Sequence, residues 1–149
     1  MSHPLGTLRG MDRCDLLWVA GLLEGEGCFR LHRDVQRRGP NRYVYYRPRV
    51  ICAMTDRDVI EKLQLVTGMG RISLGRKTAP RHKDYWQWTV SRDGDAISLM
   101  KALYPHLGSR RRAKIDQILA RWPLVRAAGV TRGHGTSRHR VDETPPLAS

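Results

Sequence analysis

Two acidic residues set between glycines are the first candidates for chemistry in this chain. They occur in Gly21-Leu22-Leu23-Glu24-Gly25-Glu26-Gly27, at the end of a run whose apolar residues have helical spacing. Gly21 and Gly25 lie four residues apart with Ala20 beside them, so a second helix can approach this side at backbone distance. The glycines also leave the chain without side chains where the helix ends, which lets the Glu26 side chain project from the end of the helix. The Gly-Glu-Gly pattern follows a helix rather than a strand, which excludes a dinucleotide-binding loop.

The elements that position these residues follow from periodicity and turn signals. Apolar spacing predicts helices that start at Asp12 or Asp15, at the capping residue Asp56, at Asp93 or Asp95, and at Ser109. The first ends near Gly25, the second at Gly68, the third at Leu103 and the fourth near Arg121. Trp122-Pro123 is expected to close the last helix, because proline disfavours helical geometry in the residue before it.

Alternation of apolar and polar residues predicts four strands, over 28–33, 45–55, 71–76 and 85–91. A loop over 37–42 joins the first two, and a turn over 78–83 joins the last two. The order is helix, hairpin, helix, hairpin, helix, helix. We therefore expect an α+β fold, αββαββαα, with an antiparallel four-stranded saddle-like sheet that carries its helices on one face.

The opposite face of this sheet is predicted to be polar. Period-2 alternation places eight hydrogen-bonding side chains on it, none of them acidic. They are Arg30, His32, Arg47, Arg49, Arg71, Ser73, Gln87 and Thr89. Such side chains can contact base edges and phosphates, and Glu26 is expected to emerge towards them. We favour a nucleic-acid-binding sheet over an ordinary solvated face, which would mix glutamate and lysine.

Net charge supports the same partner. The chain has 149 residues with 27 Lys and Arg against 14 Asp and Glu, a net charge of +13. A strongly basic domain indicates a polyanion, nucleic acid first, although a basic surface can also serve solubility. Arginine accounts for 22 of the basic residues. That usage indicates a GC-rich bacterial, archaeal or phage genome rather than an AT-rich organelle. We expect an intracellular, cytoplasmic protein of a bacterium, an archaeon or a phage-infected cell.

Several classes of protein are not expected. No apolar run is long enough for a membrane span, and the first ten residues lack a secretory segment. Cys14, Cys28 and Cys52 have no metal-ligand spacing, and their odd number argues against a disulfide framework. We expect a flexible N-terminal arm over 1–11, one domain over 12–128 and a flexible basic tail over 129–149, with no membrane and no small-molecule substrate as partner.

The motif and the order of elements together resemble a known family. Val19-Ala20-Gly21-Leu22-Leu23-Glu24-Gly25-Glu26-Gly27-Cys28-Phe29 is similar to the signature of the LAGLIDADG homing endonucleases, with Glu26 at the position of its acid. The resemblance covers about residues 12–122. It implies a DNA endonuclease that breaks both strands of a specific site across the minor groove, leaving short 3′ overhangs.

A single copy of the motif implies a homodimer on double-stranded DNA. In this family, chains with one motif pair their motif helices across a two-fold axis, which brings two Glu26 side chains together. The implied interface comprises Val19, Ala20, Gly21, Leu22, Glu24 and Gly25. A symmetric dimer predicts a palindromic or nearly palindromic target. A strand of about nine residues spans roughly nine base pairs, so the whole site is expected to have about 20 base pairs.

The resemblance also implies the catalytic groups. Glu26 and the backbone carbonyl of Gly25 would hold Mg²⁺, an ion that prefers oxygen ligands; Mn²⁺ is an expected substitute, and Ca²⁺ an ion that binds without cleavage. Arg110 matches the basic position near the scissile phosphate, with Lys114 as a second candidate. The family's polar residue after the second strand corresponds to Asp56, where relatives have glutamine, so helix capping is its simpler role. Additional DNA contacts are expected from Cys28, Ile51, Arg76 and Tyr85.

Other interpretations of these residues stay open. Glu26 can be a plain capping acid, and the basic run at 110–112 can simply grip phosphate. The same fold can also serve an RNA-binding intron maturase or a regulator that binds DNA without cutting it. An acid at position 26 favours the nuclease, because neither alternative needs a carboxylate there.

Overall fold

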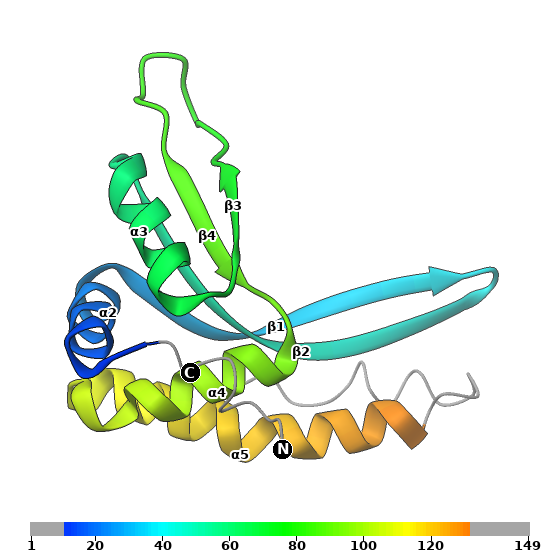
Figure 1. Cartoon of the computed structure of the whole chain (residues 1–149). Coiled ribbons are helices and arrows are strands. Elements are labelled where there is room, and N and C mark those ends of the chain that lie inside the picture. The colour runs from blue at the N-terminus through cyan, green and yellow to red at the C-terminus, as the bar shows by residue number, and fades with distance from the viewer. Residues whose placement is uncertain (1–10, 132–149) are drawn as a thin grey trace.

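The structure is a computed structural model that describes residues 11–131, and it contains the predicted order of helices and strands (Figure 1). The expected segments over 1–10 and 132–149 lie outside the described residues. The elements in chain order are α2 (Arg13–Glu26), β1 (Gly27–Arg38), β2 (Asn41–Met54), α3 (Arg57–Thr67), β3 (Arg71–Leu74), β4 (Trp86–Val90), α4 (Asp93–Leu103), the 3-10 turn η1 (Tyr104–His106) and α5 (Ser109–Thr131).

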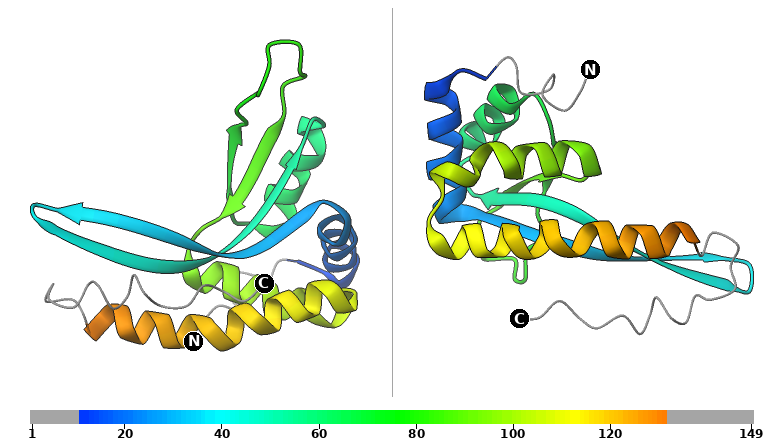
Figure 2. Two further views of the ribbon diagram at one scale, coloured as in Figure 1. Left: turned by 180° about the vertical axis from the view of Figure 1, so that it is seen from behind. Right: turned by 90° about the horizontal axis from the view of Figure 1, so that it is seen from below.

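The four strands form one antiparallel sheet in the order β1-β2-β4-β3. The β1–β2 hairpin and the β3–β4 hairpin diverge from the middle of the sheet, and the helices lie on one side of it (Figures 1 and 2). The predicted α+β class is therefore confirmed. We call the uncovered side, which carries the even-numbered residues of β1 and the odd-numbered residues of β2, β3 and β4, the open face.

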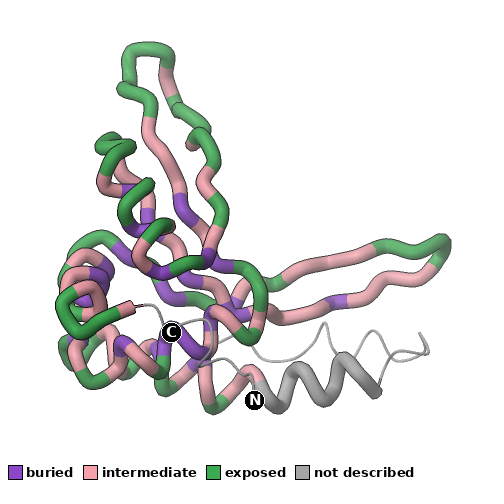
Figure 3. The backbone as a smooth tube through the Cα atoms, viewed as in Figure 1, coloured by how far each residue is buried: buried purple, intermediate pink, exposed green. Residues whose placement is uncertain are grey.

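The core lies where the helices meet the covered face of the sheet (Figure 3). Phe29, Val50 and Trp88 point into it from successive strands and are at most 2% exposed. The Trp88 indole N–H donates to the Met69 carbonyl at 2.9 Å, so the large ring is buried without losing a hydrogen bond. Side chains alternate between the two faces along each strand, so these buried residues leave their neighbours in sequence on the open face.

The first hairpin is much longer than predicted. The expected strand ended at residue 33 and a loop covered 37–42, but β1 and β2 pair without interruption as far as Arg38 and Asn41. Only Gly39 and Pro40 form the turn, with Gly39 at a φ of 62°, a conformation that glycine adopts without strain. The arginine-rich outer half lacks apolar alternation, and backbone pairing with its partner strand decides its structure instead.

Two predicted helix ends are wrong, and a third has its predicted residue without the capping bond. The Asp56 side chain makes no capping hydrogen bond, although α3 does start after it. Arg92 occupies the N-cap position of α4, so Asp93 is the first helical residue. Pro123 does not end α5, which continues to Thr131. A proline removes one N–H donor from a helix, and here α5 continues while packed along β1 and β2 (Figure 2).

The expected domain limits shift slightly as a result. Residues 129–131, assigned to the tail, belong to the end of α5. Met11, assigned to the N-terminal arm, packs partly buried against the core. Within residues 11–131, no helix has the length and apolar character needed to cross a membrane.

Candidate nucleic-acid interface and active site

Helix α2 delivers the acidic motif to the edge of the sheet. Asp12 caps its start by accepting the Asp15 N–H at 2.8 Å, and Gly27 ends it by donating to the Leu23 carbonyl. A Cβ at Gly27 would lie 2.7 Å from the Leu23 carbonyl oxygen, so only glycine lets the chain turn directly into β1. Glu26, the last helical residue, is exposed at this junction.

The outer face of α2 is open in the single chain. Gly21 and Gly25 are exposed, and a Cβ added to either meets no described atom within 4 Å. Leu17, one turn before Gly21, is 42% exposed. Val19 and Ala20 point the other way, at 0% and 2% exposure, so their side chains pack in the protomer's own core. Their expected place in a dimer interface is therefore corrected, because neither side chain can reach a partner.

The end of α2 is joined to the start of α5. The Glu24 carboxylate accepts the backbone N–H of Gly108 at 2.8 Å, so its side chain is engaged within the chain. Arg111 donates to the carbonyl oxygens of Glu24 and Gly27, at 3.1 and 2.5 Å. Sequence analysis missed Arg111, and its position inside the basic run beside Arg110 was the only signal for it.

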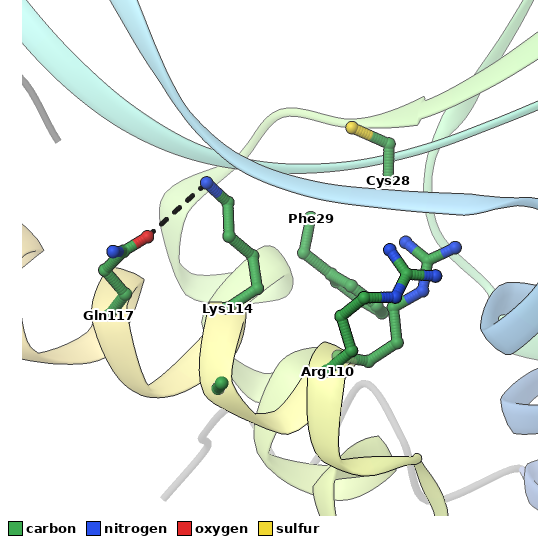
Figure 4. A pocket seen from close by; sticks show the side chains of 7 residues that line it. Cys28, Phe29, Arg110, Lys114 and Gln117 are labelled. Carbon is green, nitrogen blue, oxygen red and sulfur yellow. Dashed lines mark hydrogen bonds between the residues drawn. The ribbon is translucent and has the colours of Figure 1, made fainter. Parts of the chain in front are cut away.

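A basic hollow lies beside the α2–β1 junction. It has a volume of about 470 Å³ and lies between the edge strand β1 and the first turns of α5. Arg110 and Lys114 project from α5 towards β1, which carries Cys28 (Figure 4). The Lys114 ammonium lies 3.5 Å from the Gln117 side-chain oxygen. The two basic residues expected at a scissile phosphate are thus brought together in one hollow.

The acids available to a metal in one chain are few. Among residues 11–131 there is no group of three or more His, Cys, Asp and Glu side chains that could hold an ion. Cys52 pairs with Gly27 across the ladder and is buried. Burial and the nearby Glu26 carboxylate raise the pKa of the Cys52 thiol to about 11. At neutral pH Cys52 is therefore a protonated thiol. Of the two side chains, only the Glu26 carboxylate is then available as a metal ligand.

Strand register aligns the predicted polar residues on the open face. Arg30 lies opposite Arg49 and His32 opposite Arg47, while Ser73 lies opposite Gln87. One row crosses all four strands and contains Cys28, Ile51, Thr89 and Arg71. The alternation predicted from the sequence is confirmed, so the arginines of distant segments share one surface.

A second hollow opens on this face between β2, β3 and β4. Its volume is about 400 Å³, and its lining includes Arg49, Arg71, Ser73 and Thr89. The Nε atom of Arg49 is buried there and has no hydrogen-bond partner among the described residues. Donors and hydroxyls therefore line a recess whose charge is not compensated from within it.

Asp34 brings an acid to the open face that sequence analysis did not place there, because the predicted strand stopped one residue earlier. The carboxylate of Asp34 lies 3.8 Å from Arg47, and that of Asp93 lies 4.0 Å from the same guanidinium. Arg47 is thus partly neutralised within the chain. Arg49, two residues further along β2, forms no ion pair with an acid of residues 11–131 and keeps its charge available to a ligand.

His32 differs from the arginines around it in charge. Partial burial, then the positive charges of Arg49 and Arg30, lower the pKa of His32 from 6.5, against a smaller opposing effect of Asp34. Its ring is therefore neutral at pH 7, and its Nδ1 lies 3.2 Å from the Arg30 guanidinium. A neutral ring can accept a hydrogen bond where the neighbouring side chains only donate.

Both hairpins carry arginine with tyrosine, and in the first hairpin one such pair lies near the turn and one in the middle. The guanidinium groups of Arg38 and Arg47 lie 5.5 and 5.8 Å from the ring centres of Tyr43 and Tyr45. On the other hairpin the Tyr85 hydroxyl donates to the Arg76 carbonyl at 3.1 Å. Arg76 and Tyr85, both expected at DNA, are thus in contact through the backbone of Arg76.

Comparison with known proteins defines the fold. No family sequence model matches the chain, and no curated protein sequence does. The homing endonuclease I-CvuI, solved with its target in the presence of Ca, matches with a TM-score of 0.59 at 18% identity, over 87% of this chain and 91% of its own. The LAGLIDADG meganuclease I-CpaMI, bound to uncleaved DNA, matches with a TM-score of 0.58 at 12% identity, over 90% of this chain and 46% of its own.

This chain has the LAGLIDADG fold. A third similar structure is the archaeal intron-encoded homing endonuclease I-Vdi141I in complex with DNA, with a TM-score of 0.54 at 17% identity over 91% of this chain and 87% of that one. A second structure of I-CvuI was solved in the presence of Mg with DNA not cleaved. The resemblance seen in the motif at residues 19–29 therefore extends to the LAGLIDADG architecture of the whole described chain.

Proposed function

We propose that this protein is a sequence-specific DNA endonuclease that acts as a homodimer and hydrolyses both strands of a nearly palindromic site with a divalent metal. The observation that carries the proposal is the exposed Glu26 at the α2–β1 junction, two residues before Cys28, which lines the same hollow as Arg110 and Lys114. An acid and two cations at one edge of a basic sheet are the groups that phosphodiester hydrolysis requires.

DNA binding is supported by the open face. Its arginines lie on β1, β2 and β3, and its hollow is lined by Arg71 and by Arg49, whose Nε has no partner among the described residues. The net charge of +13 favours association with a polyanion. The similar structures I-CvuI, I-Vdi141I and I-CpaMI are named with a target or DNA, which supports the same ligand here. We assign to the DNA interface Cys28, Arg30, His32, Arg47, Arg49, Ile51, Arg71, Ser73, Arg76, Tyr85, Gln87 and Thr89.

The donors present fit a hard divalent cation. Glu26 offers a carboxylate, and Gly25 is an exposed residue whose carbonyl adds an oxygen. The protonated Cys52 adds no soft ligand, so Mg²⁺ fits this set, with Mn²⁺ as a substitute and Ca²⁺ as an ion that binds without cleavage. When bound, such an ion neutralises phosphate charge and acidifies a water molecule. One chain supplies one such carboxylate, and we assign the second to Glu26 of another copy.

Arg110 and Lys114 have a separate role in this proposal. Both cations rise from the first turns of α5 into the hollow at the edge of β1. Placed beside a scissile phosphate, they stabilise the negative charge that develops in the transition state. Their guanidinium and ammonium groups donate hydrogen bonds, which suits them to contact phosphate oxygens.

The open face of α2 supports the homodimer. A partner helix can approach at Gly21 and Gly25, and the half-exposed Leu17 with Leu22 supplies apolar area beside them. Glu24 contributes its backbone there, because its carboxylate is engaged with Gly108. The chain spans 91% of I-CvuI but only 46% of I-CpaMI. We infer that two copies of this chain form one complete nuclease.

The long hairpin lengthens the proposed target. The 12 residues of β1 span about 40 Å, or roughly 12 base pairs at 3.4 Å each. Two copies then cover about 22–24 base pairs, slightly more than the 20 expected from the shorter predicted strands. The arginine and tyrosine pair near the turn of each copy lies at an outer end of this site.

The test is incubation of the purified full chain with a randomised palindromic DNA library and Mg²⁺, followed by sequencing of the cut ends. We expect double-strand breaks at one symmetric sequence and none when Ca²⁺ replaces Mg²⁺. Selection of a DNA sequence without cleavage would assign the chain to the DNA-binding regulators. Preference for a folded intron RNA over the library would assign it to the maturases.

A further inference from the structure

The end of α2 receives its positive charge from another helix. Four carbonyl groups at a helix C-terminus lack partners and carry partial negative charge. The last turn of α2 has no basic residue of its own. Arg111 supplies one from α5: its Nε donates to the Glu24 carbonyl and its Nη1 to the Gly27 carbonyl. One guanidinium therefore holds the backbone on both sides of Gly25 and Glu26.

The contact is reciprocal. Gly108 immediately precedes α5, where backbone N–H groups lack partners inside the helix. The Glu24 carboxylate accepts the Gly108 N–H at 2.8 Å and places negative charge at the positive end of the α5 dipole. The two helix ends thus neutralise each other across 84 and 87 residues of sequence.

We propose that Arg111 is a positioning residue, which fixes the Glu26 carboxylate relative to the Arg110 and Lys114 cations. This inference rests on the nuclease function proposed above. Glu26 is exposed, and no described atom lies within 4 Å of a Cβ built at Gly25. The Arg111 guanidinium, from outside α2 and β1, therefore holds the backbone of this turn by its hydrogen bonds to two carbonyl groups. Arg110 and Lys114, the cations of the hollow, lie near Arg111 on α5. Helix α5 therefore positions these two cations and, through Arg111, the turn that carries Glu26.

Arginine is suited to this task by its shape. Its planar fork presents donors in two fixed directions, which match two carbonyl oxygens at once. A lysine ammonium carries the same charge but cannot span both groups in one geometry. The arrangement matters for rate, because displacement of a catalytic group by about 1 Å costs roughly a factor of 100.

The test compares Arg111→Gln with Arg13→Gln, which removes the same charge from the exposed start of α2, the helix whose end Arg111 contacts. Amide hydrogen exchange is followed at Gly27, whose N–H bonds the Leu23 carbonyl. We expect exchange at Gly27 to accelerate about tenfold in Arg111→Gln and to stay at the wild-type rate in Arg13→Gln. Single-turnover cleavage should slow about 100-fold, with a higher half-saturating Mg²⁺ concentration and DNA affinity within about threefold of wild type.

Rescue separates positioning from general stability. Arg111→Lys, which keeps the charge, should recover part of the protection at Gly27 and part of the cleavage rate. If Arg111→Gln fails to fold, the Lys variant decides alone, and wild-type exchange together with wild-type cleavage in it would overturn the proposal. Unchanged Gly27 exchange in a folded Arg111→Gln would overturn it directly. Because exchange needs no DNA, a wild-type chain that cleaves nothing would reject the nuclease function and leave the Arg111 contact measurable by itself.

Discussion

The carboxylates of Glu24 and Glu26 are two residues apart and have different surroundings. Glu24 accepts the Gly108 N–H and belongs to the packing of α2 against α5. Glu26 is exposed at the helix end, two residues before Cys28, which lines the hollow together with Arg110 and Lys114. A helix turns by about 100° per residue, so two positions on it point in nearly opposite directions. The exposed acid is the one free to hold a metal.

Replacement of Glu26 by glutamine tests this role at the scale of one residue. Glu26→Gln keeps the size of the side chain and removes its charge, so we expect loss of Mg²⁺-dependent cleavage by at least about 1,000-fold and nearly unchanged DNA binding. Glu61→Gln is the matched control, because Glu61 is an exposed acid on α3 that pairs with Arg57. Wild-type cleavage by Glu26→Gln in a plasmid assay would remove Glu26 from the active site.

Arg49 and Arg47 give a second comparison between neighbouring residues of one strand. Arg49 lies in the open-face hollow, whereas Arg47 lies near the carboxylates of Asp34 and Asp93. We expect Arg49→Ala to weaken binding by about 1–3 kcal/mol and to relax preference at one symmetric pair of base pairs. Arg47→Ala should cost less, because its charge is already partly neutralised. Equal losses on specific and random DNA, measured by fluorescence anisotropy, would instead assign Arg49 to phosphate contact.

At the scale of elements, α2 has two faces with different partners. Val19, Ala20 and Leu23 are buried in the protomer, and Gly21 and Gly25 are exposed opposite them. Glycine inside a helix costs about 0.5–1 kcal/mol relative to alanine. No described atom fills the space beside either glycine, so packing within the chain does not explain them. Close approach of a second copy, as in the homodimer proposed above, would explain them.

Gly21→Val should therefore separate the copies. A branched side chain at this position prevents close approach of two backbones, and overpacking costs about 1–3 kcal/mol. We expect the dimer to dissociate at micromolar concentration in sedimentation velocity, with the fold of each protomer kept. Gly94→Val is the control, because Gly94 lies in helix α4 with equally open space around its Cα. A dimer that survives Gly21→Val and dissociates with Gly94→Val would place the interface on another helix.

At the scale of the whole molecule, the open sheet and its hairpins determine how much DNA one copy can cover. The β1–β2 hairpin runs along α5, and its tip extends past the end of that helix (Figure 1). Arg38 and Tyr43 lie near its turn on the open face, with the guanidinium held over the ring. A stacked guanidinium loses less conformational freedom on binding, which favours contact at the outer end of a site.

Trimming the target tests the reach of the hairpin. Shortening each half-site from about 12 to about 9 base pairs should weaken binding at least tenfold, because the outer contacts are lost. The double variant Arg38→Ala/Tyr43→Ala should bind long and short sites about equally. Equal affinity of the wild-type protein for both sites in anisotropy titrations would show that the hairpin tip does not reach the DNA.

The sequence by itself determined the order of the helices and strands, the face of the sheet on which each strand residue lies, and the place where the acidic motif ends. Each depends on local periodicity: Phe29 and Trp88 face the core because neighbours along a strand alternate, and this places Arg30 and Thr89 on the open face. The motif at residues 19–29 also indicated the LAGLIDADG fold, which the similar structures confirm.

Tertiary structure decided whatever depends on contacts between distant segments. The outer half of β1 is a strand because β2 pairs with it, and α5 continues past Pro123 while packed along the sheet. Val19 and Ala20 are in the core because of the side of α2 that packs on the other elements. The contact between Arg111 and the end of α2 joins residues 84 and 87 positions apart, a separation that no local pattern records. Local spacing fixes which way a side chain points, and only the packed chain fixes what it meets.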